Sequence, residues 1–365
     1  MALKCGIVGL PNVGKSTLFN CLSSAKAQSA NFPFCTIEPN VGIINVPDPR
    51  LEKLEELVDP ERVVPNTMEI VDIAGLVKGA SEGEGLGNQF LGNIRETDAI
   101  LHVIRCFDDD NIIHVDDSVD PIRDKETIDM ELQLKDLETV EKRVEKAKKV
   151  ARSGDKDAKK AVEFFETVVK NLEEGKSIRS MELTEDQDIL VKELNLITAK
   201  KVLYVCNIDE ASLESGNAYV DKVKAIAATE NAGVIMICAQ LEADIAELED
   251  YAERKEFLED AGLKEPGVNK LIRNAYELLN LSTYFTAGVK EVRAWTILKG
   301  MTAPQAAGVI HSDFEKKFIR AEVIKYDDFV EFGSEAGAKE AGKLSAQGKE
   351  YIVENGDVMH FLTGA

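Results

Sequence analysis

The first twenty residues contain the feature that most constrains the fold, a glycine-rich loop between a strand and a helix. Leu3 to Val8 is a short apolar run typical of a strand, and the residues from Ser16 onward have helical spacing. Gly9, Gly14, Lys15 and Ser16 complete the pattern G-x-x-x-x-G-K-S/T between them. The flanking strand and helix disfavour a chance match, so the segment predicts a loop that holds the phosphates of a nucleoside triphosphate.

The residue types of this loop suit a magnesium-bound triphosphate. Converging backbone N–H groups and the positive end of the helix attract phosphate oxygens. The Lys15 ammonium is expected on the β and γ phosphates, and the Ser16 hydroxyl is expected to ligate Mg²⁺. The predicted nucleotide-binding residues of this segment are Asn12, Val13, Gly14, Lys15, Ser16 and Thr17.

Composition limits the partners. The 365 residues carry a formal net charge of −22, which argues against indiscriminate binding of the whole chain to nucleic acid or anionic membranes. No apolar run is long enough to span a bilayer, and we expect a cytoplasmic protein. Four cysteines that lie in or at the end of apolar runs are expected to be reduced core residues; they are Cys5, Cys106, Cys206 and Cys238.

Strand and helix signals alternate in residues 1–117, which predicts an α/β domain with a parallel sheet. The expected strands are LKCGIVG, VGIINVP, NTMEIVDIAG and DAILHVIRCF. Apolar residues then recur at intervals of three and four from Met130 to Ala151, and again from Ala158 to Leu172. The break at 153–155 makes this a helical hairpin with a coiled-coil seam.

Strand signals return with VLYVCN and GVIMICA, and a helical stretch runs to about Leu279. The hairpin is therefore expected to be an insertion at 118–199 within a nucleotide-binding domain formed by 1–117 and 200–279. Residues 281–365 contain short alternating pieces around one helix-like stretch at Pro304–Phe314 and predict a small α+β domain.

Residues downstream of the loop are expected to supply a magnesium site and a switch. In P-loop proteins an Asp at a strand end bonds the waters of the magnesium ion, and a nearby glycine senses the γ phosphate. Asp72 and Gly75, in the run DIAG, match these positions. Thr36 is expected to complete the magnesium shell, although an ordinary loop hydroxyl is the alternative for this residue.

The combination of these features resembles the YchF family of Obg-like ATPases over essentially the whole chain. The resemblance rests on GLPNVGKST, DIAGLVKGASEGEGLGNQFL, CNIDE, the inserted hairpin and the small terminal domain. It implies a G-protein fold, a terminal TGS domain of β-grasp shape and association with ribosomes, either the large subunit or the whole particle.

The base-recognition segment departs from that of guanine-binding relatives. These use N-K-x-D, whose Asp accepts two N–H donors from guanine, whereas this chain has Asn207, Ile208, Asp209 and Glu210. Loss of the lysine and the longer carboxylate of Glu210 remove guanine selectivity, and the Asn207 amide offers a bidentate match to adenine. We therefore expect binding of ATP, as the resemblance also implies. The alternative is a degraded motif that still binds GTP weakly.

Hydrolysis requires a residue that orients the attacking water. Many G proteins place Gln after D-x-x-G, but this chain has the apolar Leu76. The resemblance favours His114 for this role, the alternative being a bystander in its loop. Asn12 matches a residue that supports K⁺ in some relatives, or is an ordinary turn residue.

A basic segment at 142–160 reverses the sign of the charge locally. It contains nine basic and three acidic residues, a net charge of +6. At the tip of the hairpin it is expected to contact ribosomal RNA phosphates, with the TGS-like domain as the alternative surface and a merely solvated helix face as the simplest explanation. The function expected is a ribosome-associated ATPase switch. An Obg-like GTPase, or a scaffold that binds ATP with negligible turnover, are the alternatives.

Overall fold

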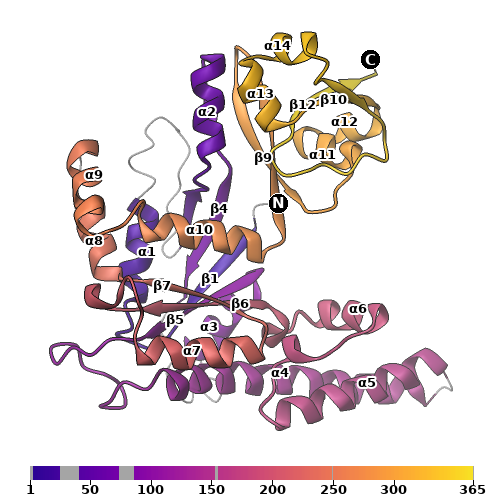
Figure 1. The fold of residues 1–365 in the computed structure, drawn as a ribbon. Helices are drawn as coiled ribbons and strands as arrows, with labels where there is room; N and C mark the ends of the chain where they lie inside the picture. The colour runs from indigo at the N-terminus through magenta and orange to yellow at the C-terminus, as the bar shows by residue number, and fades with distance from the viewer. Residues whose placement is uncertain (1–2, 25–40, 74–85, 153–154, 249, 365) are drawn as a thin grey trace. The chain divides into compact units, whose positions relative to one another are not determined.

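The computed structural model describes residues 3–24, 41–73, 86–152, 155–248 and 250–364 (Figure 1). Contacts within the chain divide it into two compact units. The first consists of Met1–Ile44 and Glu69–Leu271, and the second of Asn45–Met68 and Ile272–Ala365. None of the described helices is long and apolar enough to cross a membrane.

The first unit is built on a six-stranded sheet in the order β2-β4-β1-β5-β6-β7. Its strands are β1 (Lys4–Val8), β2 (Val41–Asn45), β4 (Thr67–Asp72), β5 (Ala99–Arg105), β6 (Lys201–Asn207) and β7 (Gly233–Ile237). β1 pairs in parallel with β4 and β5, and β5, β6 and β7 continue in parallel. Every residue of β5 is buried, as expected for a central strand that is covered on both faces. The predicted α/β class is confirmed.

Helices cover both faces of this sheet. Figure 1 shows α1 (Lys15–Ser24) on one face and α7 (Ala218–Thr229) on the other, together with the first part of α4 (Pro121–Ala151). The remaining helices of this unit are α3 (Leu86–Arg95), α8 (Ala239–Glu247), α9 (Tyr251–Asp260) and the 3-10 turn η3 (Glu210–Ser212). The first unit ends and the second resumes within α10 (Gly267–Leu278). Cys5, Cys106, Cys206 and Cys238 are free and buried, and burial raises the pKa of the Cys5 thiol to about 12.

The inserted segment forms a long hairpin with a short third helix. Its elements are α4, α5 (Lys156–Glu173), η1 (Ile178–Ser180), α6 (Glu185–Leu194) and η2 (Ile197–Ala199). Asp120 caps α4 ahead of Pro121, Asp155 caps α5, and Thr184 and Gln187 form the predicted capping box of α6. The apolar cluster that joins these helices is centred on Val140, Val144, Phe164, Phe165, Val168, Leu172, Ile178, Val191 and Leu196.

The second unit contains a six-stranded sheet in the order β11-β10-β12-β8-β9-β3. Its elements are α2 (Pro49–Val58), β3 (Val63–Val64), β8 (Leu281–Ala287), β9 (Val292–Leu298), α11 (Ala303–Ile310), α12 (Ser312–Lys316), β10 (Phe318–Ile324), α13 (Tyr326–Phe332), α14 (Glu335–Glu340), β11 (Ser345–Gln347) and β12 (Val358–Thr363). β8 and β9 form a hairpin, and the last strand, β12, lies between β10 and β8 and runs parallel to β8. This hairpin–helix–central strand arrangement is that of a β-grasp domain.

Two details of the second unit differ from the sequence prediction. The single helix expected at Pro304–Phe314 is divided, because His311 has extended backbone and caps α12. The segment YIVENGDVMHFL is a strand only from Val358, since Gly356 has a positive φ of 98° and turns the chain ahead of it.

Candidate active site

The phosphate loop lies at the carboxyl edge of the parallel sheet, between β1 and α1. Asn12 and Gly14 have positive φ angles of 63° and 90°. A Cβ atom at Gly14 would lie 2.2 Å from Nδ2 of Asn207, and one at Gly9 would lie 2.7 Å from the carbonyl oxygen of Val103. Both glycines are therefore required by close approach, and Gly14 by its backbone conformation as well.

Lys15 and Asp72 meet directly at this edge. Lys15 begins α1, Asp72 ends β4, and Nζ lies 2.6 Å from Oδ1. The Lys15 side chain is only 6% exposed. The carboxylate thus lies beside the phosphate loop, where the sequence predicted it. In this structure the ammonium of Lys15 pairs with the carboxylate of Asp72. A bound phosphate would therefore have to replace Asp72 as the partner of Lys15.

The oxygen donors near the loop suit a hard cation. Ser16 is exposed next to Lys15, and the Asp72 carboxylate is half-buried. Hydroxyl and carboxylate oxygens are ligands that Mg²⁺ prefers. Thr36, the third predicted ligand, and Gly75, the predicted γ-phosphate sensor, lie outside the described residues.

Asn207 holds the phosphate loop to the ends of two strands. Its Nδ2 donates to the carbonyl of Val13 at 2.9 Å, and its Oδ1 accepts from the N–H of Ala239 at 3.0 Å. The side chain is buried, and both of its polar atoms bond within the protein. The bidentate contact with adenine that the sequence predicts would require this side chain to leave both partners. Asn207 instead places the segment that follows it next to the loop.

The other predicted base-recognition residues follow Asn207 directly. Ile208 is 2% exposed, and its N–H donates to the carbonyl of Ile237 at 2.9 Å. Glu210 is exposed and begins η3, which the Asp209 side chain caps by accepting from the N–H of Ser212. Glu210 is therefore available to solvent, whereas Ile208 contributes apolar packing.

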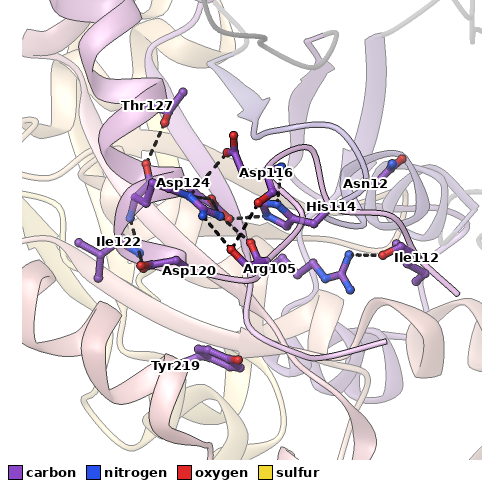
Figure 2. A network of polar contacts seen from close by, with 12 residues as sticks. Asn12, Arg105, Ile112, His114, Asp116, Asp120, Ile122, Asp124, Thr127 and Tyr219 are labelled. Carbon is purple, nitrogen blue, oxygen red and sulfur yellow. Dashed lines mark hydrogen bonds and ion pairs between the residues drawn. The ribbon is translucent and has the colours of Figure 1, made fainter. Parts of the chain in front are cut away.

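His114 lies inside the loop that follows β5, with both ring nitrogens bonded (Figure 2). Nε2 lies 2.8 Å from Oδ2 of Asp124, and Nδ1 accepts from the backbone N–H of Asp116 at 3.1 Å. Nδ1 therefore carries no hydrogen, so Nε2–H donates to the carboxylate. Arg123 donates to the other oxygen of Asp124 at 3.0 Å. The His114 imidazole is buried and faces this network.

Arg105 organises the same loop and was not anticipated from the sequence. This last residue of β5 is 2% exposed, and its guanidinium donates to three backbone carbonyls, those of Phe107, Asp109 and Ile112, at 2.9 to 3.2 Å. The cation also lies over the Phe107 ring at 4.7 Å. The only signal in the sequence is an arginine at the end of a strand that is otherwise apolar except for His102.

Asn12 connects the phosphate loop to the His114 loop. Its Nδ2 donates to the carbonyl of Ile113, the residue before His114, at 3.1 Å. The positive φ makes Asn12 a turn residue as well, and asparagine tolerates this conformation. Two predicted site residues far apart in sequence, Asn12 and His114, are thus brought into one neighbourhood.

This fold and site define a P-loop nucleotide-binding domain of the G-protein type with a helical insertion and a C-terminal β-grasp domain. Proteins named Ribosome-binding ATPase YchF are similar along the entire chain. That of Haemophilus ducreyi is 59% identical over 361 residues and that of Bacillus subtilis 58% over 363, each match covering 99% of both chains. The chain belongs to the YchF family.

Family models and a solved structure agree with this assignment. Residues 4–151 match a family described as 50S ribosome-binding GTPase, and residues 281–363 match the YchF-GTPase C-terminal family, described as a protein of unknown function. The solved structure of the Schizosaccharomyces pombe YchF GTPase is 40% identical and has a TM-score of 0.88. The match covers 99% of this chain and 97% of the Schizosaccharomyces pombe chain. The fold class predicted from the sequence is confirmed.

Proposed function

We propose that this chain binds and hydrolyses ATP in preference to GTP and that hydrolysis switches a ribosome-bound state in the cytoplasm. The names of the relatives from Haemophilus ducreyi and Bacillus subtilis support ribosome binding and ATP. The Schizosaccharomyces pombe structure is described as a GTPase, so the names alone do not decide the base.

The observation that carries the preference for ATP is the position of the segment Asn207–Glu210. The bond from Asn207 to the carbonyl of Val13 fixes this segment against the phosphate loop, where a bound nucleotide presents its base. A buried Ile208 stands in place of the lysine that covers guanine, and the Glu210 carboxylate is one methylene longer than an aspartate. Guanine therefore lacks the carboxylate that would accept its two N–H donors, whereas adenine does not need such an acceptor.

The phosphates and metal would be held by the loop and the strand ends. Backbone N–H groups of residues 12–17 and the Lys15 ammonium would hold the triphosphate, with Lys15 exchanging Asp72 for phosphate oxygens. We assign magnesium binding to Ser16, Thr36 and Asp72 and γ-phosphate sensing to Gly75. When bound, Mg²⁺ supplies positive charge that stabilises the phosphates during hydrolysis.

We assign the orientation of the hydrolytic water to His114 and potassium binding to Asn12. Because both nitrogens of His114 are bonded, this role requires the imidazole to leave Asp124. The Asn12–Ile113 bond supports coupling, since a cation or phosphate that engages Asn12 would compete with the chain next to His114.

A scaffold that binds ATP with little turnover is the second candidate. Two observations favour it, namely Lys15 bonded to Asp72 and His114 bonded to Asp124. Phosphate release with and without ribosomes separates the two functions. A switch shows ATP turnover that rises with ribosomes, whereas a scaffold shows ATP binding with turnover near background in both.

Competition calorimetry tests the choice of base. ATP should bind more tightly than GTP to the unaltered chain. The double variant Ile208→Lys, Glu210→Asp should shift the ratio of affinities toward GTP, with Lys222→Ala on the exposed face of α7 as a matched control. Equal or tighter binding of GTP by the unaltered protein would overturn the assignment and leave an Obg-like GTPase.

A further inference from the structure

A basic cavity lies on the first unit away from the phosphate loop. Its volume is about 380 Å³, within the range of small-ligand sites, about 300–1,000 Å³. It is formed where the end of α3 and the end of α6 approach the middle of α4. The five basic residues that line it are Arg95, Lys135, Lys142, Arg143 and Lys146.

Glu138 is the one carboxylate among the described residues that line the cavity, and Glu193, outside the lining, lies 3.7 Å from Arg143. Lys135 and Lys142 lie 2.7 and 2.5 Å from the oxygens of Glu138. Hydrogen bonds from these two lysines lower the pKa of Glu138 to about 2, so it stays ionised at neutral pH. The lining still carries a net charge of +4, in a molecule whose total is −22.

The two arginines of the cavity each contact a neighbouring side chain and carry further N–H donors. Arg95 Nη2 donates to Oγ1 of Thr139 at 3.0 Å, and Arg143 lies 3.7 Å from Glu193 and against the Phe165 ring. Among the residues that the structure describes, the Nε atoms of both arginines are buried and have no hydrogen-bond partner. A buried N–H donor without an acceptor is unfavourable, and the other N–H groups of each guanidinium can donate to an anion in the cavity.

We propose that this cavity is a phosphate-binding site, in which Arg95 and Arg143 donate to a phosphate group and Lys142 and Lys146 neutralise it. Guanidinium groups with a fixed orientation suit phosphate oxygens, and lysines add charge without strict geometry. The ligand is either a free phosphate compound or a phosphodiester of RNA, which share this chemistry. The site is separate from the phosphate loop and does not depend on ATP hydrolysis.

The arginine Nε–H resonances report directly on the cavity. They are followed by heteronuclear NMR of the full chain and assigned through Arg95→Lys and Arg143→Lys. Magnesium-free pyrophosphate and a short single-stranded RNA serve as separate probes. A shift of both resonances by pyrophosphate alone identifies a free phosphate compound, and a shift by RNA alone identifies a phosphodiester. If neither probe moves them, the proposal is wrong.

A matched pair of variants separates the cavity from general positive charge. Lys142→Gln, Lys146→Gln removes two cations from the cavity, and Lys222→Gln, Lys224→Gln removes two exposed cations from α7. For RNA, the slope of log K against log salt concentration should become shallower by about 1.4 in the cavity variant, because each phosphate contact on a single strand contributes about 0.7. For pyrophosphate, affinity should fall at least tenfold. Equal losses in both variants would overturn the site, and ATP hydrolysis should be unchanged in both.

Discussion

Both ring nitrogens of His114 are bonded within the protein, so neither is free to contact a substrate. Its Nε2–H donates to a carboxylate that is itself buried, and its Nδ1 accepts from the backbone of Asp116. A hydrogen bond to a charged group contributes about 1.5–3 kcal/mol, so the imidazole leaves Asp124 only for a comparable gain elsewhere. With His114 in its proposed role, we expect a low rate of hydrolysis in the absence of a partner.

Weakening the bond to Asp124 should raise basal hydrolysis. Asp124→Asn keeps the shape of the side chain but replaces a charged acceptor by a neutral one, which costs roughly 1 kcal/mol of the interaction. Phosphate release at saturating ATP should therefore increase about fivefold. The double variant His114→Ala, Asp124→Asn should be as inactive as His114→Ala alone. A lower rate in Asp124→Asn would mean that the carboxylate orients His114 for catalysis.

Removing the Lys15 ammonium should abolish hydrolysis. The γ phosphate loses its nearest fixed charge in Lys15→Ala, and the loss of one such electrostatic contact typically costs about 10²–10³ in rate. Lys222→Ala, which removes an exposed lysine of α7, serves as the control. Phosphate release by Lys15→Ala at the rate of the control would show that the loop is not the catalytic site.

Sequence reasoning located the site residues better than their contacts. Gly14, Lys15 and Asp72 were recognisable because a motif and a strand end fix their positions in the chain. The bonds of Asn207 to Val13 and Ala239 were not, because they join three segments that only the folded sheet brings together. Arg105 was missed for the same reason, since its acceptors are backbone carbonyls that carry no sequence signal.

At the scale of elements, a buried polar seam joins α4 to the sheet and to η1. Lys125 Nζ lies 2.6 Å from Asp129 and 2.5 Å from Glu230, and Arg179 lies 3.1 Å from the other oxygen of Asp129. The His102 ring on β5 lies beside this group, 5.6 Å from that of Tyr204. Breaking one partner of such a network leaves a buried charge unpaired, so the seam fixes the position of α4.

The first half of α4 does not follow the predicted coiled-coil pattern. Met130 and Leu134, expected in the coiled-coil seam, are 44% and 42% exposed, whereas Ile128 and Leu132 are buried. The first half of α4 packs on the nucleotide-binding domain, and only the second half packs on α5. A change of packing partner along one helix rotates its buried face, and the apolar spacing alone does not reveal this.

Stability should fall in acid because of His102. Burial lowers the pKa of this imidazole to about 4, with Lys125 and Arg179 adding to the effect and Asp129 opposing it. The imidazole of the unfolded chain takes up a proton near pH 6.5, whereas that of the folded protein does so only near pH 4. The free energy of unfolding is therefore independent of this group above pH 6.5 and decreases as the pH falls from 6.5 toward 4. The loss amounts to about 3 kcal/mol in the free energy of unfolding.

Urea unfolding between pH 7 and pH 4 measures this contribution. His102→Phe keeps a ring on β5 but has no titrating group, and its free energy of unfolding should vary less with pH by about the same 3 kcal/mol. Asp129 does not titrate in this window, because Arg179 and Lys125 lower its pKa despite burial. Parallel curves for both proteins would show that His102 is not the source.

Two separate stretches of the chain make up the second unit. The segment Asn45–Met68 leaves the sheet of the first unit and joins residues after Ile272. Leu51 and Leu54 of α2 are buried in a cluster with Phe285 and Phe329, and β3 pairs with β9. The sequence indicated a terminal α+β domain, but not this contribution, because nothing local marks a partner more than two hundred residues away.

Charge is also distributed unevenly over the molecule, with the basic segment 142–160 at the end of the hairpin formed by α4 and α5. Lys149, Lys159 and Lys160 are exposed there, whereas Lys148 is engaged by Glu166 at 2.9 Å. A projecting basic end attracts RNA phosphates while an acidic body is repelled by them. Ribosome association through this tip should therefore depend on Lys149, Lys159 and Lys160 and on salt.

The triple variant Lys149→Glu, Lys159→Glu, Lys160→Glu tests this contact and leaves the Lys148–Glu166 pair intact. The control Lys170→Glu, Lys222→Glu, Lys224→Glu makes the same change in charge at exposed helical positions outside the segment. Sedimentation with ribosomes across a salt series should show at least tenfold weaker binding and a shallower salt dependence for the tip variant only. Basal ATP hydrolysis should be unchanged in both, because neither set touches the phosphate loop. Equal sedimentation of the two variants would move the ribosome-binding surface away from the hairpin tip, with the C-terminal β-grasp domain as the next surface to test.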